Sequence, residues 1–509
     1  MASRTKNAKK NIVSGVISKV ISLILPFLTR TCIIHLIGST YLGLNSLFTS
    51  ILQILSLAEL GFGEAMVFSM YKPLAEHDTK KVRAILALYR KIYRIIGLVV
   101  FTVGIIILPF LEYLIQGGYP EDINVQFLYL VYLFNTVISY WLFAYKGSLL
   151  SANQQLSVTN NINTVVQVLM SFIQIILIIA FRNYYFYVIA IPVFTIIRNV
   201  TINYYSKKLY PEYYCKGSLE KNEIKEIEKR VAGLFIYKIC GTFRSSFDSI
   251  VISAFLGLVV LAKYENYFFI ANSVIGVLTI ISSGITAGIG NSMVTETKEK
   301  NYHDFFRFFF LYEWIAGWCT VCLFCLYQHF MEMWVGKELM MGNEIVILMC
   351  CYFFALKAGD MCYVYRQAAG IWWNDKFRPM IEAFSNLALN LILVNYFGVV
   401  GVLLATVITM IFINFVWGGK VLFDSYFKKS AFVYYGKITY YAIITIITTF
   451  VTNGICSLLP AVGIASFVGK MAICCVVPNL CYLLLYSKTK EFNESKPFVM
   501  NLISKRKSR

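Results

Sequence analysis

The chain has 509 residues, of which 58% are hydrophobic and only 14% are charged. Soluble globular proteins average about 45–50% apolar and about 25% charged residues, so this composition argues against a water-soluble enzyme. Lys and Arg outnumber Asp and Glu by 46 to 27, which leaves a formal net charge of +19. Such an excess is typical of nucleic-acid-binding proteins and of membrane proteins, and its distribution along the chain separates the two classes.

Fourteen apolar runs follow one another along the chain, and each is long enough to cross a hydrocarbon layer about 30 Å thick. They are predicted at 11–36, 41–70, 89–115, 124–150, 161–181, 185–206, 229–257, 265–293, 303–332, 343–368, 376–397, 399–423, 436–458 and 464–487. The first run is long and lacks a small-residue cleavage site, so we expect a retained helix rather than a signal peptide. The predicted fold class is an all-α, multi-pass membrane protein.

Lys and Arg residues gather in alternate connections between these runs. With both termini and the even-numbered connections on the cytoplasmic side, 36 of them lie inside and only Arg182, Lys263 and Lys337 lie in the opposite loops. Short cytoplasmic loops of membrane proteins are enriched in Lys and Arg. We therefore expect both termini in the cytoplasm, and the positive charge gives no reason to expect nucleic-acid binding.

The longest polar segment follows the sixth run and indicates a division into two bundles. Within it, Ile224, Ile227 and Val231 recur at helical spacing, which predicts a short amphipathic helix on the inner membrane surface. The predicted divisions are a six-helix bundle at 1–206, a cytoplasmic linker at 207–228, a second six-helix bundle at 229–423, and two further helices with a basic tail at 424–509.

Of the 46 Lys and Arg residues, seven remain within the apolar runs after the 36 counted as cytoplasmic, which include those at the run ends, and the 3 in the opposite loops are set aside. A charge near the bilayer centre costs about 2.5–3.5 kcal/mol on insertion scales, so it normally faces a partner or a water-filled cavity. We interpret six of them as candidates for a cationic substrate-binding cavity: Lys19, Arg30, Arg198, Lys238, Arg244 and Lys357. Lys19 and Arg30 fall within about 20° of the same helix face, about 16 Å apart. The seventh, Lys470, is expected to extend its ammonium group to the interface.

Acidic residues also occur within the runs, at Glu59, Glu64, Asp248, Glu313, Asp360 and Glu382. Three of them, Glu59, Asp248 and Asp360, are candidates for coupling transport to H⁺ or Na⁺. Arg244 and Asp248 are four residues apart, and Lys357 and Asp360 are three apart, so each pair can form on one helix. A structural salt bridge therefore explains these two pairs as well as a ligand role does.

The second run contains the sequence Leu60-Gly61-Phe62-Gly63 between Glu59 and Glu64. Because glycine is a weak helix former, we expect this helix to bend there.

Cysteine and histidine give no sign of a metal site or of catalysis. Cys319, Cys322 and Cys325 recur every three residues in the ninth run, but no His or carboxylate completes a ligand set there. We interpret them as small packing residues. The four histidines are scattered and form no catalytic arrangement with a nucleophile. The sequence therefore predicts neither a metal, nor a cofactor, nor an enzymatic activity.

Several segments resemble the polysaccharide flippases of the Wzx type, which belong to the multidrug/oligosaccharidyl-lipid/polysaccharide (MOP) exporter superfamily. They are LPFLTR at 25–30, IGSTYLGL at 37–44, LAELGFG at 57–63, DSIVIS at 248–253 with Leu256-Gly257, and NLALN at 386–390 with FGVVGV at 397–402. Each segment is apolar and loose, and the specificity lies in their order, which extends over nearly the whole chain.

The resemblance implies two six-helix bundles that alternately open a central cavity to the two sides of a bacterial plasma membrane. It also implies that the substrate is undecaprenyl diphosphate carrying an oligosaccharide repeat unit, and that membrane lipids, a polysaccharide polymerase and glycosyltransferases are partners. The cationic runs agree with this substrate, because a lipid diphosphate brings negative charge that Arg or Lys can meet.

Two other classes of function stay open. A multidrug cation antiporter of the same superfamily would favour acidic residues in the cavity, and the excess of cations over acids among the charges within the runs argues against it. A membrane-embedded glycosyltransferase or polymerase would need a substantial loop with clustered acids or histidines, and the outer loops here are short.

Overall fold

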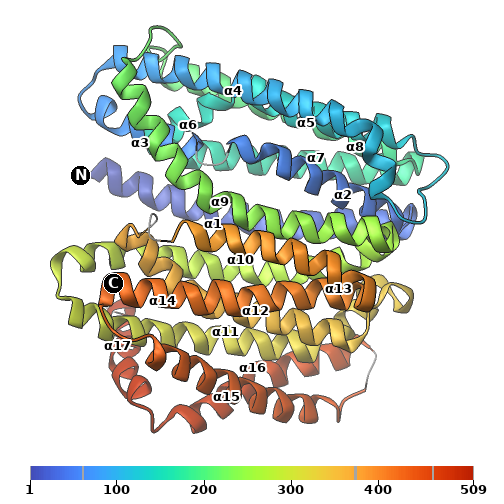
Figure 1. Ribbon diagram of the computed structural model, residues 1–509, viewed down its shortest axis with the longest axis vertical. Helices are drawn as coiled ribbons and strands as arrows, with labels where there is room; N and C mark the ends of the chain where they lie inside the picture. Colours follow the sequence, from blue (N-terminus) through green and yellow to red (C-terminus); the bar gives the residue numbers. More distant parts are fainter. Residues whose placement is uncertain (1, 60–61, 372–374, 461–462, 508–509) are drawn as a thin grey trace. The chain divides into compact units, whose positions relative to one another are not determined.

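The computed structural model describes residues 2–59, 62–371, 375–460 and 463–507, and these residues contain helices and no strands (Figure 1). Ten of the described helices are long and apolar enough to cross a membrane, or eleven if the bent pair Val125–Trp141 and Ala144–Ala152 forms one span. The predicted all-α, multi-pass membrane class is confirmed, while the count of fourteen spans stays a prediction.

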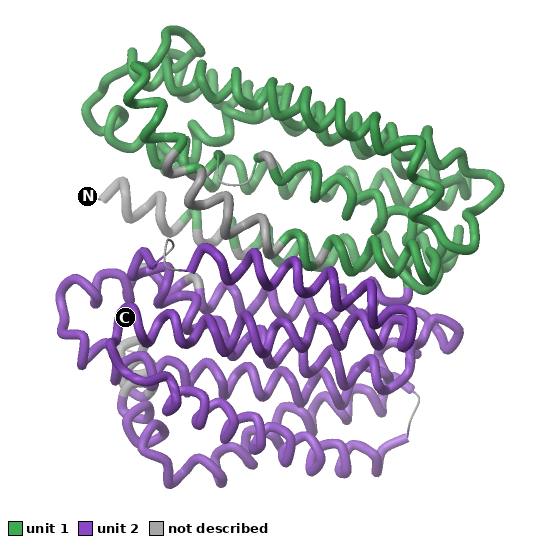
Figure 2. Tube along the Cα trace, viewed as in Figure 1, with its two compact units in different colours: residues 1–262 green, residues 263–509 purple. Residues whose placement is uncertain are grey.

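The chain divides into two compact units, Met1–Ala262 and Lys263–Arg509 (Figure 2). The first unit contains α1 (Ala2–Leu36), α2 (Ser39–Leu55), α3 (Phe62–Ala75), α4 (Thr79–Ile107), α5 (Val125–Trp141), α6 (Ala144–Ala152), α7 (Leu156–Phe181), α8 (Tyr184–Leu209) and α9 (Lys221–Leu256). In this unit α1 packs on α7, α7 on α8, and α5 on both α4 and α8. Helix α9, which the sequence analysis assigned to the second bundle, packs here against α2.

Two predicted runs of the first unit are broken. In the second run, α2 ends at Leu55, a 3₁₀ turn covers Ser56–Glu59, and α3 begins at Phe62, within the glycine-containing stretch where a bend was expected. The fourth run divides into α5 and α6, whose axes differ by 46°. Between them Phe143 has a left-handed backbone conformation, with φ 55°, which ends the helical hydrogen bonding.

The polar segment between α8 and α9 is irregular only as far as Glu220. A capping box between Glu220 and Glu223 starts α9 at Lys221. The helical spacing of Ile224 and Ile227 therefore belongs to the first turns of this long helix rather than to a separate amphipathic helix.

The second unit begins within α10 (Leu258–Thr295). It continues with α11 (Lys298–Val335), α12 (Asn343–Ala369), α13 (Phe377–Thr409), α14 (Gly418–Leu422), α15 (Phe432–Cys456), α16 (Ile464–Tyr486) and α17 (Lys490–Lys507). Two π-helical segments, Met410–Trp417 and Phe423–Phe427, flank α14. Helix α11 packs against α12, α15 and α16, so it connects the C-terminal pair to the rest of this unit (Figure 1).

The element labelled α13 contains two helices that meet at Gly398. This residue has φ 56° and ψ −133°, a conformation that suits glycine. A Cβ atom on Gly401 would lie 2.2 Å from the carbonyl oxygen of Leu393, so the two helices approach closely just after the turn. Further along, Asn386 Nδ2 donates to Thr406 Oγ1 at 3.0 Å. The two closely spaced runs predicted at 376–397 and 399–423 are confirmed as an antiparallel pair.

Candidate functional site

Two of the predicted cations of the first unit lie on α1. The helix continues through Pro26 and carries Lys19 and Arg30, both half-buried. Arg30 lies close enough to Tyr184 and Tyr187 of α8 to act on them electrostatically.

The surroundings of Arg30 are rich in hydroxyl and amide groups. The hydroxyl groups of Tyr184 and Tyr132 share a hydrogen bond of 3.0 Å, and Tyr132 donates to Asn45 Oδ1 at 2.7 Å. The guanidinium group of Arg30 on α1 therefore lies near a network of polar side chains from α2, α5 and α8. Such groups can bind the hydroxyl and phosphoryl oxygens of a ligand.

A third predicted cation, Arg198, is half-buried on α8. Its Nε donates to the amide oxygen of Asn199 at 3.4 Å, and it forms no ion pair within the part of the chain that the structure describes. Thr195, Asn199 and Asn203, each four residues apart, are buried on one face of α8. Asn199 Nδ2 donates to the carbonyl oxygen of Ser139 at 3.3 Å. Polar side chains of α8 therefore contact α5, whereas the helix surfaces that face lipid are apolar.

Glu59 ends a chain of hydroxyl groups. Tyr93 donates to Glu59 Oε1 at 2.5 Å, Tyr89 donates to the Tyr93 hydroxyl at 2.9 Å, and Ser148 donates to the Tyr89 hydroxyl at 3.1 Å. These contacts connect the 3₁₀ turn after α2 to α4 and α6. A carboxyl group held in this way can accept a proton or a cation, so Glu59 stays a candidate for ion coupling.

The remaining candidates of the first unit lie on α9. Lys238 is in a stretch whose side chains lie outside the described residues. Arg244 is half-buried and Asp248 is buried one turn later. Their pairing, and the roles predicted for all three, stay predictions.

The structure confirms the ion pair predicted between Lys357 and Asp360 on α12. Lys357 Nζ lies 2.7 Å from Asp360 Oδ2, and the two side chains are 1% and 17% exposed. The hydroxyl group of Tyr312 on α11 donates to the same oxygen. Glu313, the next residue, is buried, and neither of its carboxylate oxygens has a hydrogen-bond partner among the described groups. This cluster therefore combines one ammonium group with two carboxyl groups inside the second unit.

The sequence predicted no cluster at Arg366 and Arg378, which were counted among the 36 cytoplasmic Lys and Arg residues, at the ends of the runs at 343–368 and 376–397. Arg378 is buried and makes two 2.7 Å hydrogen bonds to the carboxylate of Asp375, and its Nη1 lies 3.2 Å from Glu382 Oε2. Arg366, also buried, lies 3.6 Å from Asp375. The spacing of Asp375, Arg378 and Glu382, at intervals of three and four residues, was the available signal.

Buried cations in the two units differ in their partners. Among the described residues, Lys357, Arg366 and Arg378 of the second unit all lie beside carboxylates. In the first unit, Arg198 meets an amide oxygen, and the buried Lys146 donates to the carbonyl oxygen of Tyr213 at 2.8 Å. The first unit therefore holds cationic charge that its described carboxylates do not neutralise at these two positions.

On the predicted cytoplasmic side of the first unit, the start of α9 is tied to the start of α4. Lys81 forms an ion pair with Glu223, and this hydrogen-bonded ammonium group lowers the pKa of the Glu223 carboxyl below its ordinary value. A surface cavity of about 560 Å³ opens beside the pair, lined by acidic and basic side chains in similar numbers. The mixed charge gives this cavity no clear preference for an anion.

No protein-family model and no curated protein matches the chain. Solved structures do match it. An inward-facing multidrug-resistance MATE transporter of the MOP superfamily has 16% sequence identity and a TM-score of 0.62, over 80% of this chain and 96% of its own. The lipid II flippase MurJ, in an inward closed conformation, has 15% identity and a TM-score of 0.64, over 94% of this chain and 98% of its own.

The chain has the fold of the MOP-superfamily transporters. A further match, the Vibrio cholerae MATE transporter VcmN in its bent form, has 15% identity and a TM-score of 0.54, over 85% of this chain and all of its own. The two MATE chains are thus aligned over almost their full length, yet 15–20% of the present chain lies outside these alignments. Only 6% of the present chain lies outside the alignment with MurJ.

Proposed function

We propose that the chain is a flippase that moves undecaprenyl-diphosphate-linked oligosaccharide repeat units across the bacterial plasma membrane by alternating access. The observation that carries the proposal is the cationic charge of Arg30 and Arg198, two half-buried arginines in apolar helices of a MOP-type fold. The likeness to the lipid II flippase over 94% of the chain supports a lipid-linked substrate.

The diphosphate is the part of this substrate that is most costly to move through the membrane without the protein. Its negative charge must leave water during transport, and an uncompensated charge in a low-dielectric environment is costly. Arginine suits this task because its planar guanidinium group binds phosphate oxygens bidentately and stays protonated. The guanidinium group of Arg198 donates a hydrogen bond to the neutral amide oxygen of Asn199. An anion can therefore replace this oxygen without breaking an ion pair.

The oligosaccharide would meet the hydroxyl and amide groups near these arginines. Tyr132 and Asn45 are linked to the Tyr184 hydroxyl near Arg30, and Asn199 lies beside Arg198. Sugar hydroxyls both donate and accept hydrogen bonds, and Tyr and Asn side chains do the same. The other predicted cavity cations, Lys19, Lys238, Arg244 and Lys357, are proposed as secondary contacts, with Lys357 the weakest because Asp360 neutralises it.

Glu59, Asp248 and Asp360 are proposed as groups that couple transport to H⁺ or Na⁺, and the structure adds Glu313 beside Asp360. Transport measured in vesicles with an imposed pH gradient, with a sodium gradient, or with neither tests coupling. Equal rates in all three conditions would remove this part of the proposal.

The test of the substrate class is export in cells. Arg30→Ala and Arg198→Ala should abolish surface polysaccharide while the amount of protein in the membrane stays unchanged. The control Lys337→Ala removes a well-exposed cation of a predicted outer loop and should leave export intact. Unchanged export in both arginine variants would refute the cationic-cavity proposal. Loss of drug resistance, rather than of polysaccharide, would instead favour a multidrug antiporter.

A further inference from the structure

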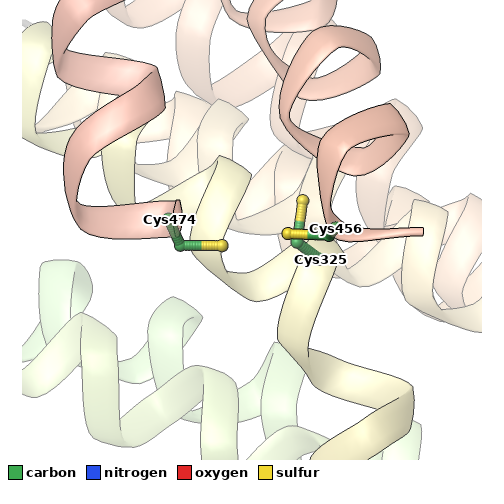
Figure 3. Close-up of side chains that lie close together, drawn as sticks. All are labelled: Cys325, Cys456 and Cys474. Atoms are coloured by element: carbon green, nitrogen blue, oxygen red, sulfur yellow. The ribbon is translucent and has the colours of Figure 1, made fainter. Parts of the chain in front are cut away.

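Three cysteine side chains from distant parts of the sequence meet in the second unit. Cys325 is on α11, Cys456 is the last residue of α15, and Cys474 is on α16. Their Sγ atoms all lie within 4.8 Å of one another, and Figure 3 shows the three side chains converging from separate helices. Cys456 and Cys474 are buried, and Cys325 is half-buried.

The backbone that carries these thiols is held by independent contacts. Helices α11, α15 and α16 pack pairwise against one another. The indole Nε1 of Trp318 donates to the carbonyl oxygen of Cys474 at 2.8 Å, and the thiol of Cys322 approaches the same oxygen at 3.7 Å. The convergence of the thiols therefore rests on a packed three-helix contact rather than on one mobile side chain.

We propose that these three thiols bind a single thiophilic ion, Cu(I), in three-coordinate geometry. A metal–thiolate bond of about 2.3 Å places three sulfurs in a trigonal plane about 4.0 Å apart, which fits within the observed separation. Thiolate ligands select soft ions such as Cu(I). Zn(II) prefers a fourth ligand. Cys322 interacts with Cys474, but the described group whose ligand atoms all lie within 4.8 Å of one another contains only Cys325, Cys456 and Cys474.

The charge around the site suits a thiolate complex. Binding of Cu(I) releases one proton from each thiol that coordinates as a thiolate. Lys470, one turn before Cys474 on α16, acts electrostatically on Cys456 and so offsets part of the remaining negative charge. Its Nζ also lies 3.2 Å from Nδ1 of His329. Because each ligand comes from a different helix, the bound ion would cross-link the C-terminal pair α15–α16 to α11.

A disulfide is the competing chemistry of these thiols. Two cysteines suffice for a disulfide, whereas three thiols whose sulfurs lie within 4.8 Å of one another supply a complete ligand set for a trigonal ion. The two assignments give different products, which a test on the intact protein separates.

The experiment uses the full chain, purified in detergent under reducing conditions, with Cu(I) supplied from a chromophoric chelator. We expect one Cu(I) per chain, a first coordination shell of three sulfurs by X-ray absorption, and a higher unfolding temperature with the ion bound. The variant Cys325→Ser/Cys456→Ser/Cys474→Ser should lose all three. Should this variant fail to fold, each single Cys→Ser change should still weaken Cu(I) binding at least tenfold.

The matched control removes three cysteines outside the cluster, in the variant Cys351→Ser/Cys475→Ser/Cys481→Ser, which should bind Cu(I) as the unmodified chain does. Equal binding by both triple variants, or none by the unmodified chain, would overturn the proposal. So would a disulfide between two cluster cysteines in protein isolated without reductant, or displacement of Cu(I) by equimolar Zn(II).

Discussion

Neutralising Lys357 and Asp360 one at a time and then together separates structural pairing from transport. Lys357 is almost fully buried and its ammonium group lies 2.7 Å from Asp360 Oδ2, while Tyr312 donates to the same oxygen. In Lys357→Met the Tyr312 hydroxyl group is the hydrogen-bond partner that the Asp360 carboxylate keeps among the described residues. In Asp360→Asn the buried ammonium group of Lys357 loses the carboxylate that it contacts.

Each single change should destabilise the protein by about 3–5 kcal/mol, because removal of one partner leaves an uncompensated buried charge. At about 1.4 kcal/mol per factor of ten, this equals about two to three and a half powers of ten in the unfolding equilibrium. The double variant removes both charges and should return to within about 1 kcal/mol of the unmodified chain, since neutral replacement of a buried pair is often harmless.

The assay is denaturant unfolding in detergent of the unmodified chain, the two single variants and the double variant. Removing the exposed pair Lys72–Glu76 in the same way supplies the control, and it should change stability little because solvent screens exposed pairs. Additive destabilisation in the double variant would refute the pairing argument. Restored stability with restored export would assign the pair to structure alone, whereas restored stability without export would assign it to transport.

Two further predictions concern the α13 turn and the cytoplasmic side. Gly401→Ala should destabilise by about 1–3 kcal/mol and lower the yield of folded protein, because its Cβ would collide with backbone across the antiparallel pair. Gly436→Ala, in open space within α15, should be neutral or stabilising by up to about 1 kcal/mol; equal effects would contradict the close-packing argument. Because the pKa of Glu223 is lowered in the folded chain, its ion pair with Lys81 stabilises the fold fully at pH values above the ordinary pKa of 4.5. This stabilisation is lost as the pH falls through the lower pKa of Glu223 in the folded chain. Glu223→Gln should therefore cost a few tenths of a kcal/mol at neutral pH, since both partners are partly exposed, and nothing at strongly acidic pH. A cost that grows on acidification would show that the sign is wrong.

Features set by local pattern were predictable from the sequence. The apolar runs gave the all-α membrane class, and the short gap at Gly398 indicated two helices rather than one. The spacing of Lys357 and Asp360 predicted an ion pair that the structure contains. In each case the decisive contacts lie within a few residues along the chain, where helical geometry alone determines which side chains meet.

Features set by packing between distant segments were not predictable in this way. The burial of Arg378 is one example. This residue was counted with the cytoplasmic Lys and Arg residues, and the local spacing of Asp375 and Glu382 does not reveal that packing buries the whole cluster. The three-residue repeat that contains Cys325 drew attention to its own helix. Its actual neighbours, Cys456 and Cys474, are more than a hundred residues away in the sequence and meet it only through helix packing.

Transport by the purified protein in liposomes shows directly whether the chain moves a lipid-linked oligosaccharide across a membrane. The substrate is undecaprenyl diphosphate carrying an oligosaccharide, and the readout is its appearance in the opposite leaflet. We predict transport by the unmodified chain, its loss in Arg198→Ala, and partial retention in Arg198→Lys, which keeps the charge without the bidentate geometry. Transport by Arg198→Ala at the rate of the unmodified chain would contradict a role of Arg198 in binding the diphosphate. Movement of cationic drugs but not of the lipid diphosphate would contradict the proposed flippase function.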